Sequence, residues 1–158
     1  MKIKTILTIA ILISASLMAA HFSPGIDREQ FREGKYIHLD QMVIEFDRSD
    51  AEVSIYYHLS PFAQVYMFLF GSKYLEPKIE EIFFDFNDTS IEEIGRTSAK
   101  IRINNISRLS SDNNYLHDSK KLGMQTSILT IVYPTGKTRR IEKAIATSDT
   151  FYDYKHLL

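Results

Sequence analysis

Apolar and polar residues alternate along two neighbouring segments, 42–46 and 51–59, and this alternation commits the chain to a fold built around a β-hairpin. Successive side chains of a strand point to opposite faces, so a period of two predicts strands with one buried face. The polar residues 47–50 between the segments have turn chemistry. Closing the hairpin there puts the apolar residues on one face, in the pairs Phe46–Ala51, Ile44–Val53 and Met42–Ile55.

Before residue 42 the alternation changes phase, because Leu39 is out of step with Met42. A β-bulge at residues 40–41 would add one residue to the strand and restore the phase. We therefore expect a bulge there, with Leu39 opposite Leu59.

Residues 61–70 are predicted to form a helix that follows the hairpin. Ser60 is suited to cap it and Pro61 to occupy its first position, while Gly71 would end it. Gln64 is its only clearly polar residue, and such a helix is either buried or lies against lipid. We favour burial on one face of the sheet, with an inward stripe of Phe62, Val65, Tyr66 and Leu69. Off that stripe, Phe68 and Phe70 would be covered by the next segment or contact a ligand or partner.

The rest of the chain predicts more strands. Residues 79–86 fit both a helix and a strand, and we favour a helical turn that leads into a strand at 82–86. Further strands are expected at 90–94, 99–106, 127–133 and 138–146, with a tight turn at 134–137, an irregular stretch at 107–125 and an aromatic tail at 151–158. This order predicts an α+β fold: an antiparallel sheet of hairpin and meander, with the buried helix packed on one face.

The first twenty residues have the order of a secretory signal peptide: two lysines, a nearly apolar run at 6–17, and small residues up to Ala20. Cleavage near Ala20 would leave a polar leader, 21–34, and one α+β domain, 35–158. The alternative is an uncleaved anchor, although residues 6–20 fall short of the roughly 20 that a membrane-spanning helix needs. We expect an exported protein, in the cell envelope or outside the cell.

Composition and net charge exclude several classes of function. The chain has no cysteine, which excludes thiol catalysis, a cysteine-ligated metal and any disulfide. The net charge is −1, and −3 once the two signal-peptide lysines are removed, so the charge does not indicate a nucleic-acid-binding protein.

No spacing of residues defines a catalytic or metal site. The five histidines include no pair at i, i+4, and we expect no cofactor. Two His/Asp pairs are candidates for a hydrolase: His117 with Asp118, and His58 with Asp40, which face each other in the hairpin register. The stretch 107–125 also carries residue types that serve acid–base chemistry or bind anions, namely Tyr115, Lys120 and Lys121.

Charge is divided along the chain, with seven acidic residues at 76–93 and four basic ones at 137–143, Arg139 and Arg140 among them. Cross-strand pairing or solvated faces would explain this division. The alternative is an anionic ligand, such as an envelope polysaccharide, bound along the basic strand.

Two short motifs remain. Asn87 and Asn105 begin intact N-glycosylation sequons at expected turns or strand ends, where a glycan could be attached. Residues 136–138 match the end of a phosphate-binding loop, but the required upstream glycine is missing and the triplet lies in an expected hairpin turn. We reject that motif.

The signal peptide, the absence of cysteine and the stretches Tyr115-Leu116-His117-Asp118 and Tyr133-Pro134-Thr135-Gly136 resemble small uncharacterised exported proteins of archaea. This resemblance implies no activity. We expect a non-catalytic module that binds another molecule, such as an envelope protein or polysaccharide, or contributes to a surface assembly. The alternative is an exported hydrolase that uses a His/Asp pair.

Overall fold

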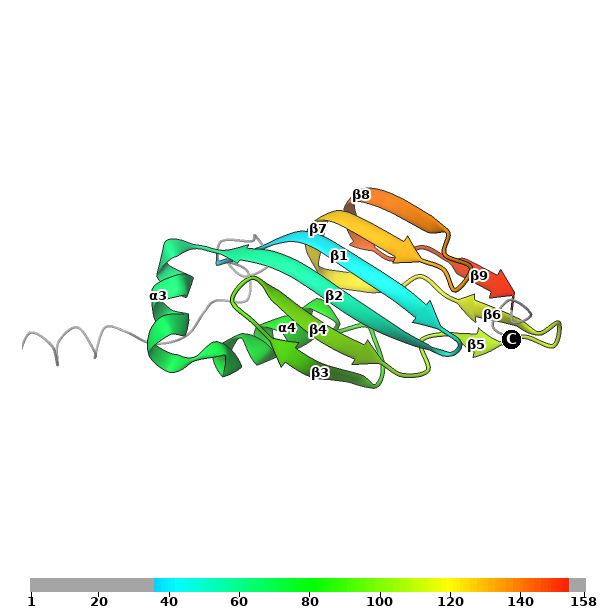
Figure 1. Cartoon of the computed structure of the whole chain (residues 1–158), viewed down its shortest axis with the longest axis horizontal. Coiled ribbons are helices and arrows are strands. Elements are labelled where there is room, and N and C mark those ends of the chain that lie inside the picture. The colour runs from blue at the N-terminus through cyan, green and yellow to red at the C-terminus, as the bar shows by residue number, and fades with distance from the viewer. Residues whose placement is uncertain (1–35, 154–158) are drawn as a thin grey trace, which may run out of the picture.

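The computed structural model describes residues 36–153, which form an elongated α+β molecule made mostly of sheet (Figure 1). The larger sheet has six strands in the order β3-β4-β2-β1-β7-β8. Their bounds are β1 Ile37–Asp47, β2 Asp50–Leu59, β3 Thr89–Ile94, β4 Ser98–Ile103, β7 Lys121–Val132 and β8 Thr138–Ala146. A smaller sheet, β5-β6-β9, comprises Arg108–Leu109, Asn114–His117 and Thr150–Asp153. The helical segments are α3 Pro61–Phe70, the 3₁₀ helix η1 Ser72–Leu75 and α4 Glu76–Ile82.

The hairpin β1–β2 has the predicted register over most of its length. Phe46 pairs with Ala51, Ile44 with Val53, and Met42 with Ile55, and all six side chains are buried. The register also shifts at the predicted bulge, between Leu39 and Gln41. The predicted pairing beyond the bulge is wrong, because Leu39 lies opposite Tyr57, and Ile37 takes the place opposite Leu59.

The larger sheet is mixed, so the prediction of a purely antiparallel sheet is wrong. β1 pairs antiparallel with β2 on one side and parallel with β7 on the other, where Ile44 lies opposite Ile131. Both of these side chains are completely buried. An apolar central strand is covered most fully when both of its edges are paired, and β7 supplies the second edge after a long crossover.

The smaller sheet forms from segments that were expected to be irregular. Residues 107–125 contain β5, β6 and the start of β7, and β9 takes up the beginning of the aromatic tail. Tyr152 of β9 fixes this sheet to the hairpin turn, because its hydroxyl donates to the Arg48 carbonyl at 2.6 Å and contacts the Ser107 hydroxyl at 3.0 Å. Phe46 packs 5.2 Å from the rings of both Tyr152 and His117.

The segment α4 and the residues after it supply the apolar cover that was expected from the earlier helix. Ile79, Ile82 and Phe83 are almost completely buried, and the Phe86 ring packs edge-on against Phe83 at 5.5 Å. The strand expected at 82–86 is therefore wrong: the helix runs to Ile82 and a turn follows. Helical spacing lets these apolar residues reach one face together.

The helix α3 has the predicted bounds and caps, but it is not buried. The Ser60 hydroxyl accepts from the Ala63 amide and Gly71 follows the last helical residue. No residue of α3 is buried: in the expected stripe Phe62, Val65 and Leu69 are exposed to solvent, and Tyr66 is partly buried. The physical reason is that α4 already covers the core, while α3 runs across the end of the molecule (Figure 1).

The expected signal peptide and leader, 1–34, lie outside the described residues. Across residues 36–153 no helix has both the length and the apolar character needed to cross a membrane.

Candidate functional site

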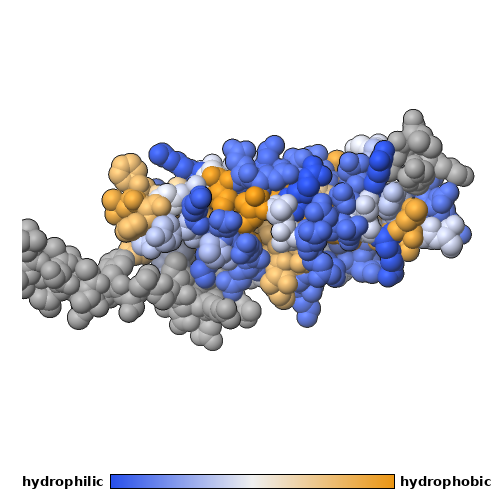
Figure 2. Space-filling model, turned by 90° about the horizontal axis from the view of Figure 1, so that it is seen from below, coloured by the Kyte–Doolittle hydropathy of each residue, from blue (hydrophilic) through white to orange (hydrophobic). Residues whose placement is uncertain are grey.

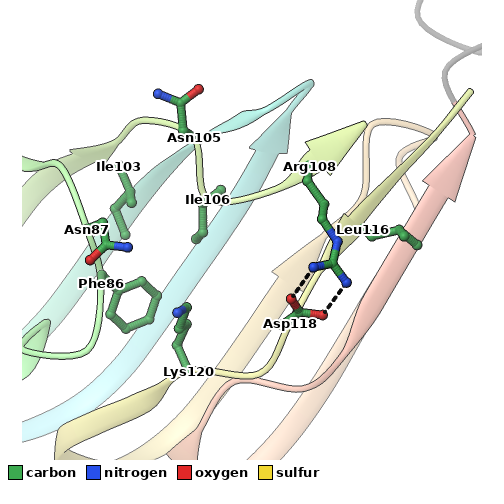
Figure 3. Close-up of a pocket in the computed structure, with 9 residues that line it drawn as sticks. All are labelled: Phe86, Asn87, Ile103, Asn105, Ile106, Arg108, Leu116, Asp118 and Lys120. Atoms are coloured by element: carbon green, nitrogen blue, oxygen red, sulfur yellow. Dashed lines mark hydrogen bonds and ion pairs between the residues drawn. The ribbon is translucent and has the colours of Figure 1, made fainter. Parts of the chain in front are cut away.

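A pocket of about 170 Å³ opens where the larger sheet, the turn after α4 and the smaller sheet meet (Figure 3). Its lining combines apolar and polar side chains: Phe86, Asn87, Ile103, Asn105, Ile106, Arg108, Leu116, Asp118 and Lys120. Phe86, Ile106 and Lys120 point toward one another across the pocket, and Asn105 stands at its rim. The pocket is therefore a small apolar floor surrounded by hydrogen-bonding and charged groups.

Local structure explains how these side chains converge. Phe86 is held by the turn after α4, in which its amide donates to the Phe83 carbonyl at 2.9 Å. Asn105 has a φ of 52°, a left-handed conformation that asparagine tolerates better than most residues. Its amide donates to the Asp50 carboxylate at 3.0 Å, which fixes the reversal between β4 and β5. The pocket thus lies at a turn anchored to the tip of the hairpin.

Two cations and one carboxylate set the charge of the pocket. Arg108 forms an ion pair with Asp118, with both nitrogen–oxygen distances at 3.3 Å (Figure 3). Their side chains are 69% and 65% exposed, so the pair adds little stability and can open toward a ligand. Lys120 is positioned through its backbone, since its amide donates to the Thr147 hydroxyl at 2.8 Å. No ion pair of the Lys120 ammonium occurs within the described part of the chain.

The predicted site residues of this segment separate onto two sides of β6. Asp118 lines the pocket, whereas His117 and Tyr115 are buried in the core behind it. His117 lies 3.1 Å from the Ile106 carbonyl through Nδ1 and 3.0 Å from the Thr147 hydroxyl through Nε2. Burial lowers the pKa of His117, and the contact with the Ile106 carbonyl partly opposes this shift. These contacts fit a neutral ring that donates through Nδ1 and accepts through Nε2, in a structural role.

The second His/Asp pair makes the contact that the sequence predicted, although the strand pairing differs. His58 lies opposite His38 in the ladder, and its Nδ1 is 2.9 Å from the Asp40 carboxylate. The Ser127 hydroxyl is 3.4 Å from His38. These groups lie exposed on a strand face and none of them lines the pocket. Across residues 36–153 no group of three or more His, Asp and Glu residues is arranged to hold a metal ion.

The other predicted residues lie on the edges of the sheet or at the pocket. Arg139 and Arg140 are on β8, at the edge opposite to the acidic strand β3, so the two charged segments do not pair with each other. Arg139 contacts the Ser148 hydroxyl at 3.3 Å. Asn87 and Asn105, the sequon asparagines, both line the pocket, and the Asn105 side chain points outward from it (Figure 3).

Sequence reasoning missed Arg108 and Phe86 as site residues. No sequence pattern indicated Arg108, because only the chain reversal at Asn105 brings it next to Asp118. Phe86 was placed in an expected strand at 82–86, whereas it lies in the turn after α4, buried beneath the pocket.

No protein-family model, curated protein or solved structure matches this chain. The geometry of the described residues is therefore the only basis for a functional assignment.

Proposed function

We propose that this protein is a non-catalytic exported or cell-envelope module that binds one acidic sugar residue, such as a uronic acid of an envelope polysaccharide, in the pocket at the sheet junction. The observation that carries the proposal is the arrangement of Lys120 and Arg108 around an apolar floor. This combination suits a ligand with one carboxylate, several hydroxyls and an apolar ring face.

Each class of lining group has a matching partner on such a sugar. The Phe86 side chain offers an apolar surface to the C–H face of a sugar ring. The amides of Asn87 and Asn105 can each donate to and accept from hydroxyl groups. Lys120 supplies a charge for the sugar carboxylate, and Arg108 can supply a second when it turns from Asp118.

Size and charge support a single sugar residue over a larger ligand. The volume of about 170 Å³ is below the roughly 300 Å³ at which pockets for drug-sized molecules begin. A pocket with two cations and one carboxylate also favours an anion over a neutral sugar.

The binding hypothesis is favoured over the hydrolase hypothesis by the positions of the histidines. His117 is enclosed in the core, and the His58–Asp40 pair lies outside the pocket. A hydrolase needs a nucleophile, a base and a substrate cavity in one place, and neither pair combines them.

The test is a titration followed by two-dimensional NMR, with glucuronate as the ligand and glucose and acetate as comparisons. Glucuronate should shift the amide signals of Asn87, Asn105 and Lys120 and bind more tightly than either comparison molecule.

The Lys120→Gln variant should weaken glucuronate binding at least about tenfold, since a hydrogen bond to a charged group contributes roughly 1.5–3 kcal/mol. Lys121→Gln is the matched control, because it removes the same charge from the adjacent residue, which does not line the pocket. Equal affinities of these two variants, or signal shifts that occur only elsewhere, would disprove the proposed site.

A further inference from the structure

Within residues 36–153, the helix α3 carries more large exposed apolar side chains than any other element. Phe68 is 79% exposed and is the most exposed of them. The others on α3 and η1 are Phe62, Val65, Leu69, Phe70 and Tyr74. Figure 2 shows these apolar groups gathered at the end of the molecule that α3 occupies. Apolar surface of this extent is typical of a contact site and not of a free solvated helix.

Polar groups on α3 are few, and two of them are already used within the protein. The Gln64 side chain donates to the Leu59 carbonyl at 2.9 Å, and the Ser60 hydroxyl accepts from the helix amide of Ala63. Between Leu59 and Lys73 the chain has no charged residue. The outer surface of this helix therefore has very few groups that can form hydrogen bonds with water.

The aromatic rings of this end form a connected cluster. Tyr66 lies 4.6 Å from Phe70 and 5.4 Å from Tyr74, and Phe70 lies 5.6 Å from Tyr74. Rings that are already packed against one another lose little side-chain freedom when they are covered. Tyrosine combines an apolar ring with a polar tip, which suits the boundary between lipid and water.

The position of α3 indicates which surface would cover it. Tyr36, at the start of the described chain, has its ring 6.2 Å from that of Phe62, and its carbonyl accepts from the Ser60 amide at 2.9 Å. The chain that connects the apolar segment 6–20 to the domain therefore joins it beside α3. Residues 21–35 can span at most about 50 Å. The apolar segment enters a membrane either as a signal peptide during export or as a retained anchor, and for as long as it is attached it keeps α3 within that span of the membrane.

We propose that α3 and η1 dock onto a lipid bilayer, with the exposed aromatic and aliphatic side chains inserted at the level of the headgroups. The helix lies in the interface and does not span the bilayer, because its ten residues measure about 15 Å and the hydrocarbon core is about 30 Å thick. It lacks the basic face of helices that bind anionic lipid, so insertion depends on apolar burial and takes place on zwitterionic lipid. This site is independent of the sugar pocket.

The experiment uses the absence of tryptophan from the chain, which makes one introduced indole a unique fluorophore. The full-length Phe68→Trp variant is mixed with phosphatidylcholine vesicles whose acyl chains carry bromine, a quencher of indole emission. The matched control is Phe151→Trp, since Phe151 is 70% exposed on β9, at the far end of the molecule (Figure 1).

Bromine should quench the Phe68→Trp variant and shift its emission to shorter wavelength at both low and high salt, while the control variant keeps its emission. Both variants carry the same N-terminal segment, so attachment through that segment alone would leave them equally unquenched or equally quenched. Either of those equal results overturns the proposal. A shift without vesicles, together with a dimer in sedimentation, overturns it as well, because α3 would then be covered by a second copy of the chain.

Discussion

Gly123 on β7 allows α4 to approach the sheet, and replacing it with alanine should displace that helix. An alanine Cβ built at this position would overlap the Glu81 carbonyl oxygen, and it would lie 2.9 Å from the Glu81 carbonyl carbon and 3.2 Å from the Ile82 Cα. Carbon atoms pack best at about 3.5–4.0 Å. Because the carbonyl oxygen would be closer still, α4 would have to move by about 1 Å or more. Both sides of this contact are backbone, which cannot turn aside as a flexible side chain can.

The energetic cost follows from what α4 covers. Ile79, Ile82 and Phe83 are almost completely buried, and their contacts weaken together if the helix moves outward. Overpacking costs about 1–3 kcal/mol. A gap of 0.5–1 Å forfeits a further quarter to a half of the dispersion energy of the contacts that it opens. We therefore expect a loss of about 3 kcal/mol in the free energy of unfolding and a Tm lower by roughly 10 °C.

The assay is thermal and urea unfolding of the full chain, followed by circular dichroism, with Gly136→Ala as the control. Gly136 has a φ of +78° and no atom within 4 Å of a built Cβ, so its replacement costs only the backbone strain of about 1–2 kcal/mol. Because Phe86 follows α4, Gly123→Ala should also weaken glucuronate binding in the pocket, whereas Gly136→Ala should leave it unchanged. A Gly123→Ala variant at least as stable as Gly136→Ala would refute the packing argument.

Three further predictions concern the core, the buried histidine and export. Val53→Asp should abolish the cooperative unfolding transition, because it places a charge on the buried face opposite Ile44. Ser54→Asp, on the other face, should be tolerated. Similar transitions for both variants would show that the register is wrong. The free energy of unfolding should fall as the pH drops below 6.5, because the lowered pKa of His117 means that the folded state resists protonation. In urea titrations, His117→Gln should make the free energy of unfolding depend less on pH. Intact-mass analysis of protein from its native host should show a chain that begins near His21; one beginning at the first methionine would favour an anchor.

The local parts of the fold could be predicted from the sequence. Strand alternation fixed the register between Phe46 and the bulge, and capping chemistry fixed both ends of α3 at Pro61 and Phe70. Each of these features depends on residues that are near in sequence. The turn between β7 and β8 follows for the same reason, with Gly136 in the positive-φ position.

The parts that failed depend on contacts between distant segments. The burial of α3 was inferred from its apolar composition, but composition does not reveal that Ile79 and Ile82 of α4 take the place against the core. The parallel pairing of β1 with β7 joins Leu39 to Thr126, and nothing in either strand specifies that partner or direction. The first error concerned which of two apolar segments covers the core, and the second concerned which strand pairs with β1 and in which direction.

The pocket shows the same limit at the level of single residues. Asp118 was singled out from its chemistry, and it does line the pocket, but its expected partner His117 faces the core. Adjacent residues of an extended chain point to opposite sides, so His117 at the end of β6 and Asp118 directly after it face different surroundings. The assignment of this segment as an irregular loop concealed that restriction.

The pairing of β1 with β7 also determines when the domain can complete its fold. Leu39 and Thr126 are partners in the central ladder, so strand β1 cannot be paired on both sides until most of the chain is available. A chain delivered with its amino end first would form β1, β2, β4 and β3 as a sheet with an open edge at β1. Sheets that depend on such distant partners form slowly, because the connecting chain loses its freedom before the contacts are gained. When the chain emerges amino end first, this topology therefore postpones closure of the larger sheet until nearly the whole chain is available.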